Sequence, residues 1–535
     1  MRTKYFGKTT KTTDEFGRIQ NNRQETRATQ CLFQAYSYIQ SIEKMKRNWI
    51  YRLFSSRKFE LFIFWIVLGA VAFLHGRWIL VHFTSHGYLF DSGWFAHLFE
   101  SADPLLKNPR IIDELSYYST HLSPYLFLFG APLAIGFGLN GVEIFAIHQG
   151  LFFGLFYLAL YLIAAPPNGL PQPHRLIAMM LALLIGSSNV LLFQAAGYPH
   201  FEISMIATTS LALATYLRNR NFLFVLSLLM LPLIREDGGF YAALICLLIL
   251  TLNFRRQDGW NREQTKLIIL ALAGVLIAAL CFLIKSKLFP GADTFGSNFS
   301  GDGWSHLSAH FMVERLANLV SQNNFLIIIT GTVTLSSYDR RYLSGLVLLS
   351  PLIAIYLLAV RDELGQFTLY YGLPWLLICL NWVAVFVSRG RGKNPPTTME
   401  CLLILGLALS LSSPVQHLLH MQENHSRIPI QAVKAERGDI RSMIAFLQPL
   451  VHPPSQEKKD EICASIGIAA LIPDALNPKQ FITAESSLKS CRQILLLHGD
   501  MDYDTLRSQA TKTGFILRSR SGNAEHWSKN DTEKP

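Results

Sequence analysis

The chain has 535 residues, of which half are hydrophobic and only 16% are charged. A soluble globular protein would carry roughly a quarter charged residues, so this composition excludes an ordinary soluble enzyme. Apolar runs of about 17–25 residues recur and are long enough to cross a bilayer. The net charge of +11 does not indicate nucleic-acid binding, because most lysines and arginines lie in the N-terminal arm and in short loops, as the positive-inside rule predicts.

Hydropathy divides the chain into three regions. Residues 1–58 form a basic arm, 59–419 a membrane domain with a long first outer loop (83–141), and 420–535 a C-terminal domain with a polar tail. The arm has no apolar segment near its start, so no cleavable signal peptide is expected. It is either an amphipathic helix on the membrane surface or a disordered arm.

About eleven membrane spans are predicted. Basic loops then fall on one side of the membrane, and loops that contain acids and histidines fall on the other. The N-terminus is therefore expected in the cytoplasm and the C-terminal domain outside. The spans lie near residues 60–82, 142–165, 175–194, 201–217, 222–235, 238–253, 266–285, 323–337, 342–360, 368–388 and 399–417.

The apolar segment 121–139 is interpreted as a helix in the membrane interface. Two prolines and three glycines interrupt it, which weakens it as a span. Counting it as a crossing would also move the basic loops to the outside, against the positive-inside rule.

The region after residue 420 predicts a small α/β domain of roughly 100 residues. Helices are expected at 436–450 and 505–513, and strands at 462–469, 480–484 and 493–498. The seven cysteines show no zinc-binding spacing. Cys463 and Cys491 would be able to pair if this domain faces an oxidising compartment.

Five polar clusters fall on the predicted outer side. They are FDSGWF (90–95), THLSP (120–124), GYPHFE (197–202), IREDGG (234–239) and VRDELGQFTLYYGLP (360–374). Charged residues near membrane depth are costly, so they usually pair with one another or serve a pathway. The clusters together predict a site on the outer face.

The first three clusters each allow two interpretations. Asp91 is either a partly desolvated general base or an N-cap for the following helix. His121 either binds a phosphate, a carboxylate or a metal, or starts the interface helix with Ser123 as its cap. His200 and Glu202 either bind substrate or are hydrogen-bonded loop residues.

The other two clusters are also open to two interpretations. Arg235 would hold a lipid phosphate, with Glu236 or Asp237 orienting it or binding a cation. Alternatively, the three residues form a self-contained salt-bridged turn, which could dip into the bilayer as a broken hairpin. Tyr370 and Tyr371 are either part of the site or members of the aromatic belt at the membrane interface.

The order of these motifs resembles a prokaryotic family of polytopic membrane proteins, domain of unknown function 2079, which is related to the GT-C superfamily of membrane glycosyltransferases. The resemblance covers about residues 85–500. The family pattern has an Asp in the first loop, His-x-Ser-Pro, a His-Pro-Glu-like motif, Lys-Glu-Asp and a Tyr near a late span. This chain departs from it in Pro-His-Phe-Glu at 199–202 and in Arg235, where the family usually has Lys.

The resemblance implies an inverting GT-C-like enzyme of the inner membrane. Such an enzyme transfers a sugar from a polyprenyl-phosphate donor to an envelope glycan, lipid or protein. Asp91 would then be the general base, and Arg235 the cation that stabilises the departing phosphate. The remaining residues expected to bind substrate or phosphate are His121, His200, Glu202, Glu236, Asp237, Tyr370 and Tyr371.

Three points stay open at the level of the sequence. Some GT-C enzymes use a divalent ion such as Mg²⁺ or Mn²⁺, and the acids here are compatible with one. The chain could instead be a transporter or flippase of lipid-linked intermediates. It could also be a non-catalytic membrane protein that binds glycans or protein partners.

Overall fold

The computed structural model describes most of the chain beyond the N-terminal arm. The chain divides into two units, residues 1–66 and 67–535. The expected amphipathic helix of the N-terminal arm lies outside the described residues. The structure describes residues 57–85, 90–106, 116–166, 169–253, 261–291, 296–301, 303–418, 437–451, 462–472, 481–482, 488–498 and 502–529.

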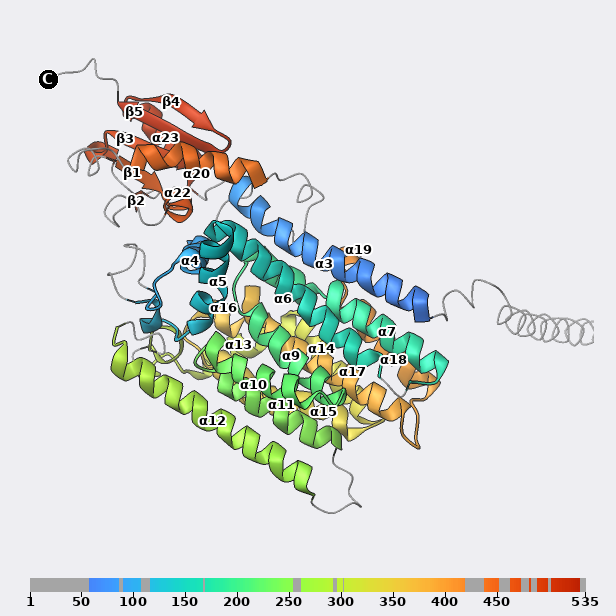
Figure 1. The fold of residues 1–535 in the computed structure, drawn as a ribbon. Helices are drawn as coiled ribbons and strands as arrows, with labels where there is room; N and C mark the ends of the chain where they lie inside the picture. The colour runs from blue at the N-terminus through green and yellow to red at the C-terminus, as the bar shows by residue number, and fades with distance from the viewer. Residues whose placement is uncertain are drawn as a thin grey trace, which may run out of the picture. The chain divides into compact units, whose positions relative to one another are not determined.

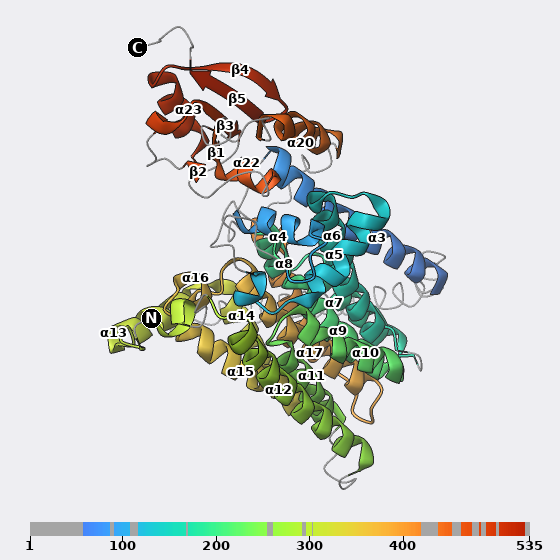
Figure 2. The same ribbon diagram turned by 60° about the vertical axis from the view of Figure 1, so that its left-hand side comes forward.

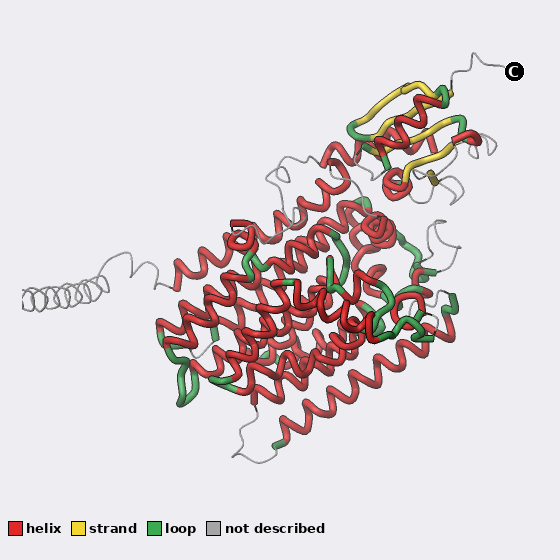
Figure 3. Tube along the Cα trace, turned by 180° about the vertical axis from the view of Figure 1, so that it is seen from behind, coloured by secondary structure: helices red, strands yellow, loops and turns green. Residues whose placement is uncertain are grey.

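Helices make up nearly all of the described membrane domain (Figure 1; Figure 3). In chain order they are α3 (Arg57–Ser85), α4 (Phe90–Glu100), η1 (Tyr117–Ser119), α5 (Pro124–Phe137), α6 (Gly141–Ala164), α7 (Gln172–Ser187), α8 (Val190–Gly197), α9 (Ile203–Leu217), α10 (Asn221–Ile234), α11 (Gly238–Asn253), α12 (Arg262–Leu288), η2 (Gly296–Ser300), α13 (Ala309–Ser321), α14 (Asn323–Ser336), η3 (Arg340–Tyr342), α15 (Leu343–Leu357), α16 (Asp362–Gly365), η4 (Leu369–Trp375), α17 (Leu376–Gly390), α18 (Thr398–Ser410) and α19 (Ser413–Leu418).

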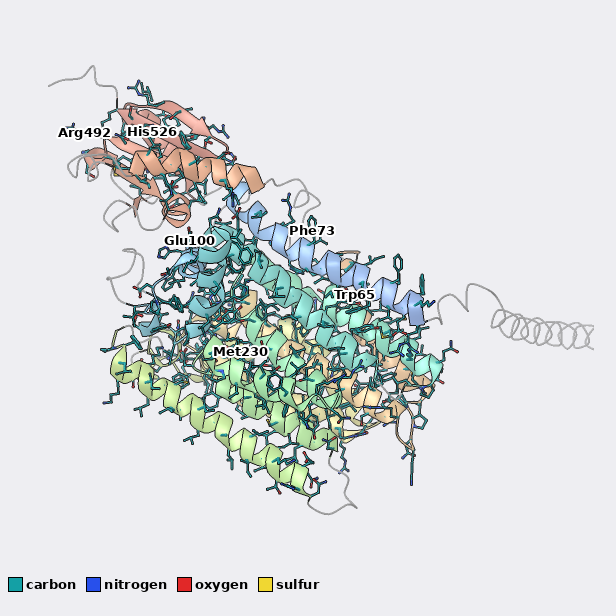
Figure 4. The ribbon with its side chains drawn as sticks, in the orientation of Figure 1. Trp65, Phe73, Glu100, Met230, Arg492 and His526 are labelled. Carbon is teal, nitrogen blue, oxygen red and sulfur yellow. A yellow bond between two sulfur atoms is a disulfide. The ribbon has the colours of Figure 1, made fainter. Side chains whose placement is uncertain are left out.

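The helices confirm a membrane protein. Five helical segments within the described residues are long and apolar enough to cross a bilayer, judged by length and composition, and several shorter apolar helices accompany them. Large apolar side chains are exposed on helices at the periphery of the bundle, such as Phe73 on α3 (Figure 4) and Leu276 on α12. Such surfaces fit lipid better than water. The count of eleven crossings stays a prediction.

The expected interface segment does form a helix, α5. It begins at Pro124, and Gly138 ends it in the left-handed conformation (φ 58°) that a glycine adopts readily. Ser123 occupies the N-cap position but makes no capping hydrogen bond, so the expected side-chain cap is wrong. The location of α5 in the membrane interface stays a prediction.

Two of the predicted continuous spans are each interrupted. The expected span 175–194 is divided into α7 and α8, and 399–417 into α18 and α19. The interruptions pair with each other through an antiparallel bridge between Asn189 and Ser412, with backbone hydrogen bonds of 2.7 and 2.9 Å. This pairing satisfies backbone groups that would otherwise be costly inside a membrane protein.

Glycines allow α11 and α12 to approach closely. A Cβ atom on Gly239 would lie 2.2 Å from the carbonyl oxygen of Gly274, and one on Gly274 would lie 2.6 Å from the carbonyl oxygen of Gly239. Small residues at a helix crossing permit close backbone contact in membrane proteins. As a result α12 lies alongside α11 (Figure 1), and its last turn carries Lys285, whose Nζ lies 3.4 Å from Oε1 of Glu236.

The C-terminal domain is a five-stranded mixed sheet with helices (Figure 2). The strand order is β2-β1-β3-β5-β4; β1 is parallel to β2 and β3, whereas β5 is antiparallel to β3 and β4. A disulfide joins Cys463 and Cys491. The elements are α20 (Arg437–Val451), β1 (Ile462–Ser465), α22 (Ile466–Leu471), β2 (Phe481–Ile482), η9 (Leu488–Ser490), β3 (Gln493–Leu497), α23 (Tyr503–Lys512), β4 (Phe515–Ser521) and β5 (Ala524–Lys529).

The structure corrects the sequence prediction at two places in this domain. The expected strand 462–469 ends at Ser465 and continues as α22, because a short apolar run does not distinguish a strand from a buried helix. The expected polar tail forms the β4–β5 hairpin instead, with Gly522 at φ 55° in its turn. Most side chains of β4 are exposed, so this edge strand lacks the apolar alternation of a half-buried strand.

Candidate functional site

A tight turn between α10 and α11 carries the charged triplet. Arg235 has an extended backbone (φ −159°, ψ 153°), and α11 begins at Gly238. A Cβ atom on Gly238 would lie 2.0 Å from the carbonyl oxygen of Leu231, so only glycine lets the chain reverse this sharply. The turn places three consecutive charged side chains between two apolar helices.

Arg235 connects this turn to the GYPHFE cluster. Its Nε donates to Oδ1 of Asp237 at 2.6 Å, and Nη2 donates to the other oxygen of the same carboxylate. Its Nη1 also donates to Oε1 of Glu202 at 2.7 Å. The salt-bridged turn is therefore present, but it is not self-contained. Arg235 and Glu202 are 9% and 8% exposed, and geometry of this kind holds a guanidinium rigidly.

Glu236 connects the same turn to the THLSP cluster. Its carboxylate lies 3.0 Å from Nδ1 of His121, accepts a 3.0 Å hydrogen bond from the Leu122 backbone N–H, and lies 3.4 Å from Nζ of Lys285. Burial alone would raise the pKa of Glu236, but His121, Lys285 and Arg235 outweigh it and lower the pKa to about 2. The side chain is therefore a carboxylate at neutral pH.

His200 lies between two aromatic rings. Phe95 of α4 meets it edge to face at 4.2 Å between centroids, and Tyr370 stacks on it at 3.9 Å. The Tyr370 hydroxyl donates to the Tyr371 hydroxyl at 2.7 Å, and Nδ1 of His200 contacts Oε2 of Glu202. Tyr370 is buried, so it packs within the cluster and is not exposed as a belt residue would be.

Four of the five polar clusters thus meet through direct side-chain contacts. The fifth, FDSGWF, reaches them through Phe95, which contacts both His200 and Phe201. Asp91 lies in the first turn of α4, which begins at Phe90, and its roles as a general base or as a helix cap stay predictions. The side chain of Asp91 lies outside the described residues.

A cavity of about 760 Å³ opens beside these residues. Polar side chains that are buried or partly buried line one part of it: His121, Glu202, Arg235, Glu236, Asp237 and Lys285. Apolar side chains of α11, α12 and α15 line another part, and three of them are partly exposed: Phe240 (45%), Phe282 (42%) and Ile355 (44%). The cavity is therefore amphipathic, and its charged side chains are less exposed than these three apolar ones.

The donor set of the cluster does not form a recognisable metal centre. Among the described residues, no group of three or more His, Cys, Asp or Glu side chains is arranged to hold a metal ion. The carboxylates of Glu202 and Asp237 face Arg235, and that of Glu236 faces His121 and Lys285. We derive no chemical step through a metal.

No protein-family model matches the chain, and no curated protein matches it. Among solved structures it is similar to the archaeal oligosaccharyltransferase AglB from Archaeoglobus fulgidus, in complex with an inhibitory peptide and a dolichol-phosphate. The TM-score is 0.42 and the sequence identity 13%, over 89% of this chain and 75% of that one. A likeness of this extent decides neither fold nor activity, so the GT-C-like architecture and the family membership stay predictions.

Two members of the site, Lys285 and Tyr356, were not among the residues expected from the sequence. Lys285 lies in the last turn of α12, and Tyr356 lines the cavity from α15. The signal for Lys285 was present, because it and Lys287 stand at the end of an apolar span that is expected on the outer side, where the positive-inside rule does not expect cations. Tyr356 had no signal, since a tyrosine near a span end is ordinary.

Proposed function

We propose that the protein is a membrane glycosyltransferase that takes a sugar from a polyprenyl-phosphate donor and transfers it to an envelope glycan, lipid or protein. The observation that carries this proposal is the amphipathic cavity, in which the side chains of Arg235 and Lys285 are 11% and 13% exposed, whereas three apolar side chains are 42–45% exposed. A lipid phosphate likewise combines a charged group with an apolar chain. The guanidinium group of arginine and the ammonium group of lysine both bind phosphate.

The cations are held in place before any substrate binds. Arg235 is oriented by Glu202 and Asp237, and Lys285 lies beside Glu236. Preorganised charges stabilise developing negative charge without the cost of reorientation during the reaction. Arg235 and Lys285 are therefore suited to stabilise the negative charge that develops on the oxygen of the departing lipid phosphate.

Asp91 is our candidate for the general base. It stands one helical turn before Phe95, on the same face of α4, and Phe95 contacts His200 in the cluster. The acceptor would lose its proton to Asp91 and attack the anomeric carbon of the sugar. The bond from that carbon to the phosphate oxygen would break, and its electron pair would stay on the phosphate. A single displacement of this kind inverts the configuration.

The disulfide between Cys463 and Cys491 supports an extracytoplasmic location for the C-terminal domain. Disulfides persist in oxidising compartments and are rare in the cytosol. This agrees with the orientation expected from the basic loops, in which the N-terminus is cytoplasmic and the cavity opens on the outer side of the inner membrane.

The test uses the purified full chain in lipid nanodiscs and a panel of polyprenyl-phosphate sugars. Wild type, Asp91→Asn and the control Asp103→Asn would be compared for sugar release and transfer. Asp103 is a suitable control because it belongs to the same outer loop and bonds locally, to the Leu105 N–H. Turnover lost only in Asp91→Asn supports the proposal, whereas equal turnover in all three excludes Asp91 as the base. Failure of every donor to bind rejects the proposed activity.

A transporter of lipid-linked intermediates is the second candidate function. The observation in its favour is the pair of interrupted helices, α7–α8 and α18–α19, which meet at Asn189 and Ser412. Interrupted helices are typical of transporter binding sites. Movement of a fluorescent polyprenyl-phosphate sugar across proteoliposome bilayers, without sugar release, would favour this function over the enzyme.

A further inference from the structure

Helix α13 has three distinct faces. One face is buried and carries Arg315 and Leu319. A second is exposed and polar, with His310, Glu314 and Ser321. A third is exposed and apolar: Val313 is 66% exposed, Leu316 49% and Val320 58%. These apolar positions repeat at the three- and four-residue spacing that aligns side chains along one side of a helix.

The buried face is fixed to the protein by Arg315. This arginine donates to Oδ1 of Asp362 at 2.8 Å and to the carbonyl oxygen of Ala359 at 3.2 Å, and it lies over the Phe311 ring at 4.7 Å. A Cβ atom on Gly365 would lie 2.8 Å from Cζ of Arg315, so the glycine leaves the space that the guanidinium occupies. The orientation of α13 about its own axis is therefore defined, and its apolar face points away from the protein.

The helix runs in a direction that suits a membrane surface. Figure 2 shows α13 crossing the direction of α12 and α15, at the same end of the bundle as α16. It packs on α14 and α15 and belongs to the loop expected on the outer side. The exposed apolar surface of α12 continues to its outer end at Leu288, which is 68% exposed. Trp304, 37% exposed, precedes α13 and is typical of the membrane–water interface.

We propose that α13 lies in the outer surface of the lipid bilayer, with Val313, Leu316 and Val320 inserted at the boundary between head groups and acyl chains. A helix with one apolar and one polar exposed face adopts this position. The occupant of the apolar face is lipid, because α13 packs on α14 and α15, which themselves expose large apolar side chains such as Val333 (54%) and Val347 (56%). The proposal is independent of the enzymatic activity.

The position of α13 affects the cavity through the segment that precedes it. Asn298 and Phe299 line the cavity, and their carbonyl oxygens accept hydrogen bonds of 3.2 Å each from Arg361 and Val360. Arg315 bonds to the carbonyl oxygen of the same residue, Val360, at 3.4 Å. Lipid contact by α13 would thus hold one wall of the cavity at the level of the membrane surface.

The experiment places an environment-sensitive fluorophore on single cysteines of the full chain in nanodiscs. The variants are Val313→Cys, Val320→Cys and, on the polar face, Glu314→Cys, in a background of Cys31→Ser and Cys281→Ala. Quenching would be measured with lipids brominated near the head group and with aqueous iodide. We expect bromolipid quenching to be several-fold stronger at the two valine positions than at Glu314, and iodide quenching to be stronger at Glu314.

Two results would overturn the proposal. Equal iodide quenching at Val313 and Glu314 would show that the apolar face is in water. Protection of both valine positions from iodide and from bromolipid alike would show that a second copy of the chain or another protein covers them. Leu316→Cys replaces either valine variant if that variant does not yield folded protein by size-exclusion chromatography.

Discussion

Glu236 offers the sharpest prediction, because its carboxylate joins three parts of the site. Substitution by Gln preserves the shape of the side chain and an oxygen for the Leu122 N–H, but removes the negative charge between His121 and Lys285. The difference between the ordinary pKa of 4.5 and the folded value of about 2 corresponds to about 3 kcal/mol of stability. The side chain is only 5% exposed, so solvent screening reduces this little.

The sign of the pH dependence follows from the direction of the pKa shift. Because folding lowers the pKa of Glu236, its contribution is fully present above pH 4.5 and is lost as the pH falls toward 2. The stability difference between wild type and Glu236→Gln should therefore be constant from pH 5 to 7 and should shrink below pH 4.5. Unfolding in mild detergent, followed by tryptophan fluorescence across this range, measures the difference.

A matched control is Glu263→Gln, in which the lost pair with Lys266 is exposed. Its free energy of unfolding should change by less than about 0.5 kcal/mol, as is usual for surface substitutions. The reasoning fails if Glu236→Gln behaves like this control at neutral pH. It also fails if the difference from wild type has the same size at pH 3 as at pH 7.

Three further predictions concern other contacts. Arg235→Ala leaves the buried carboxylate of Glu202 and the partly buried one of Asp237 without their cation and should lower the free energy of unfolding by about 3 kcal/mol, whereas Arg235→Lys should recover part of this in the same fluorescence assay. Gly239→Val should separate α11 from α12 and lower the thermal midpoint in detergent by several degrees, but Gly406→Ala, with no atom within 4 Å of the new Cβ, should not. Replacing both Cys463 and Cys491 by Ser opens a loop with a sequence separation of 28 and should cost the C-terminal domain about 3–4 kcal/mol, measured by urea unfolding; an unchanged midpoint would contradict it.

Local sequence signals predicted most of the helices but not their interruptions. Gly141–Ala164 matches the expected span 142–165 within a residue, because a long apolar run with an Asn140–Glu143 capping box has few alternatives. The division between α7 and α8 depends on the pairing of Asn189 with Ser412. No local pattern contains a contact between residues so distant in the chain.

The candidate site was predictable as a set of residues but not as a geometry. Charged residues near the membrane interior are energetically costly, and this alone identifies Arg235 and Glu236 as candidate site residues from the sequence. The sequence does not show that Arg235 bonds to Glu202, or that Glu236 bonds to His121 and not to the adjacent Arg235. These pairings result from helix packing, which the sequence pattern constrains only in part.

The balance of charges in the cluster bears on how a product would leave. Arg235 and Lys285 already face the carboxylates of Glu202, Glu236 and Asp237. An incoming phosphate must compete with these internal anions, so part of its attraction is offset before it binds. In the proposed reaction, the same carboxylates would reclaim both cations after transfer and displace the spent lipid phosphate. A cluster whose two cations already face three internal carboxylates would thus favour turnover over tight retention of the product in the proposed reaction, and product release often limits the rate of an enzyme.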